Sequence, residues 1–277
     1  MIVVKEFPDR EFSNKEELFK ALRENKNTLI AQKKMVTKFA DAVISYVELD
    51  RKQAEAIKED NSTNEDVSKL KAKLVINTTN LMDSHSDVHF KGIWNKSVKE
   101  QKNILLLQEH QMKFNSIISD NVTASVKKMS WNKLGYDFEG DTEALIFDSE
   151  IEKERNEFMF KQYSKGYVKE HSVGMRYVKL DLAINSESKY DVEEKAIWDK
   201  YIDEIANKEV AEAQGYFWAV TEAKIIEGSA VVKGSNYATP TISIEAVKNS
   251  TSEEQKEEPT VVTQKEEKLL KDLLNKF

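Results

Sequence analysis

The spacing of apolar residues predicts helices in the first fifth of the chain. Ser13 and Glu16 fit a capping box, in which each side chain satisfies one free backbone N–H at the start of a helix. The pattern that follows predicts one or two helices over 14–48, on the apolar positions Leu18, Leu22, Leu29, Ile30, Val36, Phe39 and Val43. The polar stretch 52–64 predicts a loop or a frayed helix.

Other segments have the short apolar runs and alternation of β-strands. Strands are predicted over 2–7, 70–81, 103–107, 173–184 and 217–232, the last being the longest, with two short strands over 135–151 that turn at Gly140 and Asp141. A turn-rich loop covers 83–92. A short helix over 151–165 should end at Gly166, and an amphipathic helix over 190–213 near Gly215. The predicted fold class is therefore α+β.

The composition changes towards the C-terminus. Residues 249–265 are rich in Ser, Thr, Glu and Lys, which predicts a flexible linker. Residues 266–277 place leucines on one helical face, so a short amphipathic helix should dock on another surface. The predicted organisation is an N-terminal arm with helices (1–69), a central domain (70–242), and a disordered linker with a short helix (243–277).

Composition narrows the function classes. Hydrophobic residues make up 40% and charged residues 33% of the 277 residues, as in soluble globular proteins. The net charge of -7, with acids and bases interleaved, argues against general affinity for nucleic acid or for an anionic membrane. The chain has no cysteine, which excludes disulfides, thiolate metal sites and a cysteine nucleophile. No apolar run is long enough for a membrane span, and the N-terminus does not resemble a signal peptide, so we expect a cytoplasmic protein.

Two histidines in a polar loop are candidate metal ligands. His85 and His89 have a spacing that could bind zinc from one helical face, and Asp83 and Asp87 flank them. The local sequence is typical of a turn rather than a helix, and no third ligand is evident nearby. A polar loop without metal or cofactor is the preferred interpretation.

His110 and Ser172 are candidate catalytic residues. His110 directly follows an apolar run that predicts a buried strand, where a rigidly placed imidazole can act as general base. Ser172 lies between a predicted helix and a predicted strand and is followed by Val173 and Gly174, a position that suits an exposed nucleophile. His171 is not expected to be its base, because adjacent residues of an extended chain point to opposite faces.

Two glutamates are candidate partners for the histidine. Glu227 lies inside an apolar strand, where an unpaired carboxylate is costly, so it should face solvent or accept a hydrogen bond, for which a histidine N–H would serve. Glu222 is the second candidate in the same stretch.

Taken in order, these segments resemble the serine proteases that mature the proheads of tailed bacteriophages. That family has an Asp-x-x-x-Asp loop ending in glycine and an aromatic residue, a His after an apolar strand, a helix ending in Gly, Ser-[Ile/Val]-Gly, and a strand with Glu-x-Ser-x-Val before Asn and Ala. The matching residues, which span about 70–240, are Asp83, Asp87, Gly92, Trp94, His110, Gly166, Ser172, Val173, Gly174, Glu227, Ser229, Val231, Asn236 and Ala238.

The resemblance implies a fold similar to that of herpesvirus assemblin, with a β-barrel core, surrounding helices, added N-terminal helices and a flexible C-terminal tail. It implies a serine endopeptidase in which Ser172 is the nucleophile, His110 the general base and Glu227 the residue that orients the imidazole. The expected substrates are the phage scaffold protein, the major capsid protein and the protease itself, cut inside the procapsid in the host cytoplasm. Self-association is a further expectation, and the C-terminal segment could tether the enzyme to scaffold or shell.

The sequence departs from the family at two places, near Asn115–Ile117 and at Gly234–Asn236, where the family has Pro-Ile-Gly and Pro-Ala. These departures bear on the shape of the substrate groove. Two other hypotheses remain open: a catalytically inactive, scaffold-like head-assembly protein on the same fold, and a metal-dependent hydrolase that uses His85 and His89.

Overall fold

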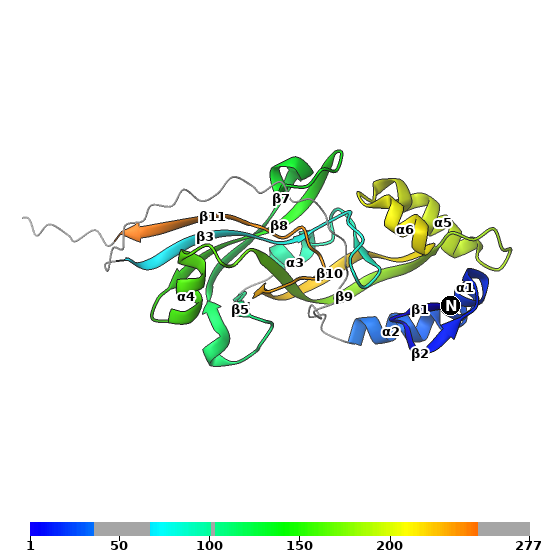
Figure 1. Cartoon of the computed structure of the whole chain (residues 1–277), viewed down its shortest axis with the longest axis horizontal. Coiled ribbons are helices and arrows are strands. Elements are labelled where there is room, and N and C mark those ends of the chain that lie inside the picture. Colours follow the sequence, from blue (N-terminus) through cyan, green and yellow to red (C-terminus); the bar gives the residue numbers. More distant parts are fainter. Residues whose placement is uncertain (36–66, 101–102, 249–277) are drawn as a thin grey trace, which may run out of the picture. The chain divides into compact units, whose positions relative to one another are not determined.

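The computed structural model describes residues 1–35, 67–100 and 103–248. The strands are β1 (Ile2–Val4), β2 (Phe7–Phe12), β3 (Val67–Thr78), β4 (Asp87–His89), β5 (Leu106–Gln108), β6 (Ile117–Ser119), β7 (Asn121–Ser130), β8 (Asp141–Glu152), β9 (Glu170–Ile184), β10 (Tyr216–Val231) and β11 (Thr241–Lys248). The α-helices are α1 (Lys15–Glu24), α2 (Lys26–Met35), α3 (Asn95–Glu100), α4 (Glu157–Ser164), α5 (Val192–Tyr201) and α6 (Lys208–Gln214). The predicted α+β class is confirmed (Figure 1).

Strand β10 organises the sheet that carries the candidate site. Along its length it pairs antiparallel with β9. Its other edge pairs in parallel with β4 near its start, where Trp218 is opposite Asp87, and with β5 near its end, where Gly228 is opposite Leu106. One long strand therefore brings together β4, β5 and β9, which are far apart in the sequence (Figure 1).

A second sheet has the order β11-β3-β8-β7 and packs against the first. The contact is tight at Gly228, where an added Cβ would lie 2.4 Å from the ring of Phe147 in β8. Buried side chains from both sheets form the main core, among them Leu74, Ile76, Leu106, Ile118, Leu145, Phe147, Val173 and Ile225.

The predicted closed barrel is not formed by the described strands. On one side the sheets meet around Pro240, which bridges to Glu170 and accepts a hydrogen bond from Val75 N, and the side chains of Thr239 and Thr241 donate to His171 O and Val168 O beside it. Proline has no N–H and cannot extend a ladder. On the other side, between β6 and β8, a side chain makes the hydrogen bond that joins the two sheets: Ser119 Oγ donates to Glu150 O. Besides the two-stranded β1–β2 sheet, the described strands therefore form two packed sheets.

Several local predictions need correction. The N-cap of α1 is Asn14 instead of Ser13: its side chain accepts from Glu17 N, and Glu17 accepts from Ser13 N, so the capping box lies one residue later. The predicted helix over 190–213 is broken into α5, a 3-10 turn (Ile202–Glu204) and α6, because Ile202 and Ile205 turn into a separate apolar cluster with Trp198.

The strand boundaries also differ from the prediction. The segment 135–151 holds the single strand β8, and the predicted turn at Gly140 and Asp141 instead joins β8 to a 3-10 turn that follows β7. The predicted linker start at 243 falls inside β11, which is hydrogen-bonded to β3 in the second sheet. The chain divides into Met1–Val247 and Lys248–Phe277, so the predicted N-terminal arm belongs to the same compact unit as the sheets. The predictions for 36–66 and for the C-terminal tail at 249–277 lie outside the described residues.

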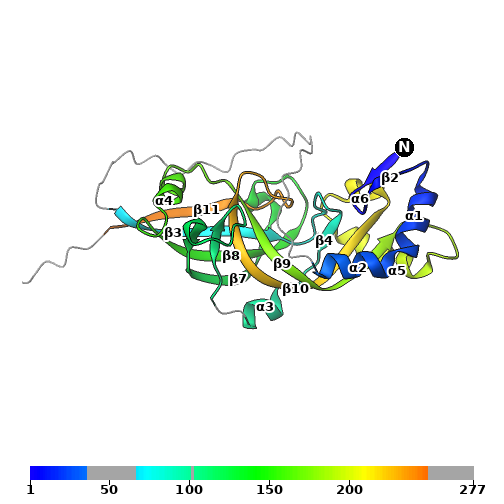
Figure 2. The same ribbon diagram turned by 90° about the horizontal axis from the view of Figure 1, so that it is seen from below.

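The N-terminal helices are tied to the central sheet by buried charges. Lys33 of α2 is only 10% exposed, and its Nζ lies 2.6 Å from Asp87 Oδ1 in β4 and 3.8 Å from Glu6 Oε1. Glu6 also accepts hydrogen bonds from Trp218 Nε1 and Tyr216 Oη of β10. Figure 2 shows α2 beside the β9–β10 ribbon. Across the described ranges, no helix is long and apolar enough to cross a membrane.

We predict that Lys33→Met destabilises the protein by about 3–5 kcal/mol, because it leaves two buried carboxylates without their cation. The matched control is Lys20→Met, which removes the exposed i,i+4 pair with Glu24 and should cost less than about 1 kcal/mol. Urea unfolding of the two variants measures both values. Equal small losses would show that the buried charges do not fasten α2 to the sheet.

Candidate functional site

His110 lies in a tight turn at the end of β5. Glu109 and His110 have φ angles of 50° and 55°, and Gln111 N donates to Gln108 O across the turn. Two successive positive φ values with this bond are the signature of a type I′ turn, which normally takes Asn-Gly. A Glu-His pair pays a conformational cost there of about 1–3 kcal/mol per residue. The turn must therefore be stabilised by contacts outside itself.

Those contacts come from the end of β10. Glu109 N donates to Ala230 O at 3.0 Å, and Glu109 Oε1 accepts from Val232 N at 3.1 Å. His110 N donates to Ser229 Oγ at 3.0 Å. The strained turn is thus anchored to Ser229, Ala230 and Val232, at and just beyond the end of β10, which fixes the imidazole over that part of the strand.

The imidazole of His110 is bound by the buried carboxylate of Glu227. His110 Nδ1 donates to Glu227 Oε1 at 2.6 Å, and Glu227 has no exposed surface. Because a carboxylate only accepts, this bond requires the proton on Nδ1, which leaves Nε2 as the nitrogen that can act as a base. This is the tautomer that a general base for a hydroxyl requires.

Ser229 completes the arrangement. Its hydroxyl donates to Glu227 Oε2 at 2.6 Å while it accepts from His110 N. One hydroxyl has a single proton, so Ser229 donates only to the Glu227 carboxylate, and its two hydrogen bonds hold Glu227 and the His110 backbone in place. Sequence reasoning did not assign this role to Ser229, although its position two residues after Glu227 puts it on the same face of the strand.

Ser172 lies across the ladder from this group. In the β9–β10 register Ser172 is opposite Ser229, and Gly174 is opposite Glu227. A Cβ added to Gly174 would lie 2.0 Å from Glu227 Oε1, so the carboxylate occupies the space above this glycine. Since residues 172 and 174 share a face, the Ser172 side chain is on the same face as Glu227 and beside the His110 turn.

The hydroxyl of Ser172 is sheltered, with the residue 7% exposed. Within the described ranges, no hydrogen bond joins Ser172 Oγ to His110. Catalytic hydrogen bonds are often longer without substrate and tighten in the Michaelis complex. The arrangement is that of a hydroxyl, an imidazole and a carboxylate brought together by three segments of one sheet, and it can support nucleophilic attack by the hydroxyl.

The structure separates His171 from this group. His171 Nδ1 donates to Thr239 O at 3.1 Å, and Nε2 is 3.1 Å from Tyr163 Oη. Burial lowers the pKa of His171 to about 4, against a weaker opposing effect of the hydrogen bond to Thr239. It is therefore a neutral, fully bonded core histidine on the face opposite Ser172.

Glu222, the alternative partner, lies elsewhere. Its carboxylate forms ion pairs with Lys179 at 2.8 Å and with Lys96 at 3.4 Å. The hydrogen bond to Lys179 is the main cause that lowers the pKa of Glu222. The structure brings Glu227, and not Glu222, to His110.

The loop with the two remaining histidines is a hydrogen-bonded network. His89 belongs to β4 and is buried, with Nδ1 at 3.2 Å from Asn77 Oδ1 and Nε2 at 3.3 Å from Tyr177 Oη. Burial is the largest effect on the pKa of His89, which is lowered. Tyr177 Oη donates to Asp87 Oδ2, whose other oxygen is paired with Lys33.

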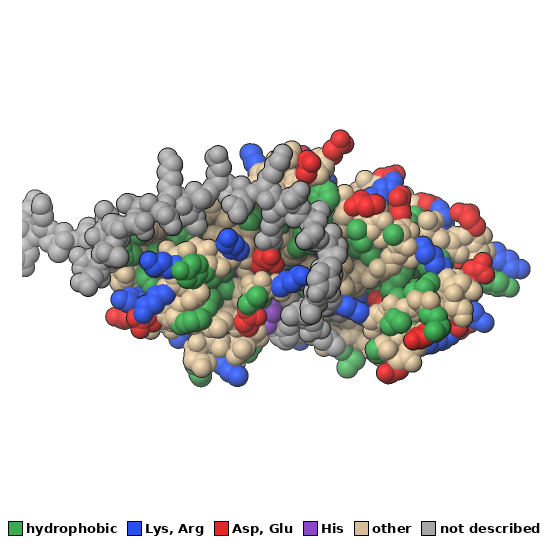
Figure 3. All heavy atoms as spheres, viewed as in Figure 1, with side chains coloured by type: hydrophobic (Ala, Val, Ile, Leu, Met, Phe, Trp, Pro, Cys, Tyr) green, Lys and Arg blue, Asp and Glu red, His purple; other side chains and the backbone are tan. Residues whose placement is uncertain are grey.

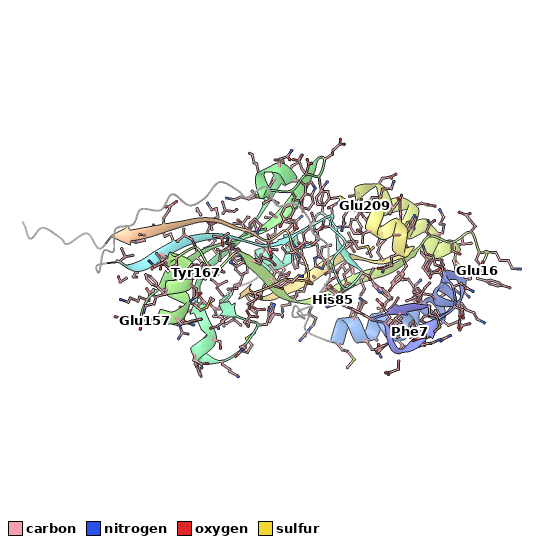
Figure 4. The ribbon with its side chains drawn as sticks, viewed as in Figure 1. Phe7, Glu16, His85, Glu157, Tyr167 and Glu209 are labelled. Carbon is pink, nitrogen blue, oxygen red and sulfur yellow. The ribbon has the colours of Figure 1, made fainter. Side chains whose placement is uncertain are left out.

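Asp83 closes the turn before β4. Its Oδ1 accepts from the backbone N–H groups of His85 and Asp87. Burial opposes ionisation of Asp83, but His85 and the other donors outweigh it and lower its pKa to about 2. Figure 4 labels His85 on this loop. Over the ranges that the structure covers, no three His, Cys, Asp or Glu side chains are grouped as metal ligands. The ring nitrogens of His89 are already engaged with Asn77 and Tyr177.

Figure 3 shows histidine atoms (purple) at the surface of one face, between hydrophobic and acidic side chains. Comparison with known proteins identifies no relative: the chain matches no protein-family model, no curated protein and no solved structure.

We predict that Gly174→Ala breaks the His110–Glu227 hydrogen bond. The new Cβ would fall roughly 1.5 Å short of ordinary contact distance from Oε1, so the carboxylate must move. The exchange-protected Nδ1–H resonance of His110 in proton NMR should disappear. Gly140→Ala is the control: its added Cβ meets nothing within 4 Å, and the strain at φ +80 should leave that resonance in place. A resonance that persists in Gly174→Ala would contradict the geometry.

Proposed function

We propose that this chain is a serine endopeptidase in which Ser172 is the nucleophile, His110 the general base and Glu227 the residue that orients the imidazole. The observation that carries the proposal is the 2.6 Å bond from His110 Nδ1 to the buried Glu227, on the face of the sheet that also carries Ser172, which is opposite Ser229 in the ladder. A buried carboxylate on the far nitrogen of a histidine, next to a serine hydroxyl, is the arrangement of serine hydrolases.

In the proposed mechanism, His110 Nε2 takes the proton of Ser172 as Oγ attacks the carbonyl carbon of the scissile peptide bond. The imidazolium is stabilised by Glu227, which stays ionised and gains a full charge partner. His110 then gives the proton to the leaving amine, and an acyl group remains on Ser172. A water molecule, activated by the same nitrogen, releases the acyl group as a carboxylic acid.

The substrates that we propose follow from the resemblance to the prohead proteases of tailed phages. The matching motifs occur here in the family's order, apart from the departures at Asn115–Ile117 and Gly234–Asn236, and the assemblin-like arrangement of the core is part of the same proposal. The chain would cleave scaffold and major capsid proteins, and itself, inside the procapsid in the host cytoplasm. The net charge of -7 is consistent with protein substrates rather than nucleic acid.

The test is co-expression of the full chain with the neighbouring scaffold and capsid proteins, with products identified by intact mass. We predict discrete fragments with the parent chain and none with Ser172→Ala, because losing a triad nucleophile costs about a million-fold in rate. Ser164→Ala, a change at an exposed serine of α4, is the matched control and should cleave like the parent.

Two outcomes would overturn the proposal in different ways. Intact partners with all three chains would favour the inactive, scaffold-like assembly protein. Equal cleavage by the parent and by Ser172→Ala would show that another residue is the nucleophile. Full activity in the presence of a chelator is expected, and its loss would favour the metal-dependent hydrolase.

A further inference from the structure

A small cavity borders Ser172 on the edge of β9 that faces away from β10. Its volume is about 10 Å³, close to the space that one water-sized oxygen needs. Its walls come from four segments, which are β9 (Ser172, Val173, Met175, Tyr177), β3 (Ile76, Asn77), the loop into β4 (Asp83, His85, His89) and the segment after β10 (Ser235, Asn236). A serine nucleophile needs such a space, because its substrate's carbonyl oxygen becomes an anion that must be surrounded by donors.

The backbone N–H of Val173 points toward this side of β9. In an antiparallel ladder the residues alternate between bonding the partner strand and pointing away from it. The backbone groups of Gly228 and Ala230 point toward β5, because Gly228 N donates to Leu105 O and Ala230 O accepts from Glu109 N. The residues opposite them in β9, Val173 and His171, therefore form no ladder bonds with β10. His171 N accordingly donates outward, to Thr239 Oγ1. Two residues on, Val173 N has the same direction, and no acceptor among the described residues takes it up.

The side-chain amide of Asn77 supplies a second donor. Asn77 is 1% exposed, and its Oδ1 accepts from Trp94 Nε1 at 3.2 Å and faces His89 Nδ1. The bond from Trp94, which can only donate, fixes which end of the amide is oxygen. No hydrogen bond from Nδ2 to a described residue is found, so this amide and the backbone of Val173 offer two N–H donors beside the cavity.

The side-chain amide of Asn236 in the cavity wall already forms hydrogen bonds through both its oxygen and its nitrogen. Its Oδ1 accepts from Thr78 Oγ1 and Ala238 N, and its Nδ2 donates to Thr78 O. His85 lines the cavity as well, but its ring nitrogen Nδ1 faces the carboxylate of Asp83 at 3.9 Å. Asn77 therefore has a side-chain N–H group that it can offer to the cavity.

We propose that Val173 N–H and Asn77 Nδ2 form the oxyanion hole of this site. The inference rests on the proposed function of Ser172 as nucleophile. When Ser172 Oγ adds to a carbonyl carbon, the oxygen that gains negative charge enters the cavity and accepts from both donors. The residue after the nucleophile supplies an oxyanion-hole N–H in other hydrolases as well, and each such donor contributes about 10²–10³ in rate.

The test uses a fluorophosphonate probe on the full chain, so that no natural substrate is needed. Ser172 Oγ attacks phosphorus, the P–F bond breaks, fluoride leaves, and the hydroxyl proton passes to His110. The phosphoryl oxygen takes the place of the oxyanion. Intact mass against time gives the second-order rate constant, and peptide mapping gives the labelled residue.

Two variants remove one donor each. Asn77→Asp keeps an oxygen for Trp94 Nε1 and replaces the amide NH2 with an acceptor. An amide-to-ester replacement at 173, made with the α-hydroxy acid analogue of valine, deletes only the N–H. We expect each to slow labelling by about 10²–10³-fold. His85→Gln is the matched control in the same cavity and should label at nearly the parent rate, and thermal unfolding checks that each variant folds.

The outcomes separate the inference from the proposed function. Labelling of the parent at Ser172, with Asn77→Asp and the ester variant both folded and reacting at the parent rate, would overturn the oxyanion hole and leave the nucleophile in place. A larger loss in His85→Gln than in Asn77→Asp would also overturn it. An unlabelled parent, or equal labelling of Ser172→Ala, would instead contradict the proposed function.

Discussion

The hydrogen bond between His110 and Glu227 depends on a carboxylate that has no contact with solvent. An ionised carboxylate in such a place is costly unless each oxygen is satisfied. Here one oxygen accepts from His110 Nδ1 and the other from Ser229 Oγ. The same contacts explain why position 174 is a glycine and why the turn at Glu109 can adopt a strained backbone. Gly174 lacks the Cβ that would fill the carboxylate's space, and the strained turn at Glu109 is stabilised by the bonds that deliver His110 to it.

The fold serves this arrangement through the length of β10. Its last third pairs with β5, which ends in the His110 turn, and with the part of β9 that contains Ser172. Its first third pairs with β4, which carries the network of His89, Asp87 and Lys33 and so reaches the N-terminal helices. A network of buried charges and a candidate catalytic group are thereby connected by one continuous strand.

Local patterns in the sequence were sufficient for part of this account. Alternation of apolar residues predicted the strands around 173–184 and 217–232, and the cost of a buried charge predicted a hydrogen-bond partner for Glu227. The same alternation put His171 and Ser172 on opposite faces, as the contacts of His171 now show. These features depend on neighbours within one segment.

Features that depend on long-range pairing could not be predicted in this way. The register that places Ser172 opposite Ser229 is set by the whole β9–β10 ladder, and the residue pair itself gives no signal. His89 was expected in a polar loop, but pairing with β10 makes it a buried strand residue. The predicted β-barrel core is not closed by the described strands, which are joined between β9 and β11 by an isolated bridge and side-chain bonds, an arrangement that local sequence does not reveal.

The central claim is that His110 and Glu227 act as one unit on Ser172, and a double-mutant cycle tests it most directly. His110→Ala, Glu227→Gln and the double variant would be compared by their rates of cleavage of the co-expressed scaffold protein. If the carboxylate acts only through the imidazole, the double variant should be no slower than His110→Ala alone. Additive losses would contradict the account, because Glu227 would then contribute to the reaction, or to the fold, without His110.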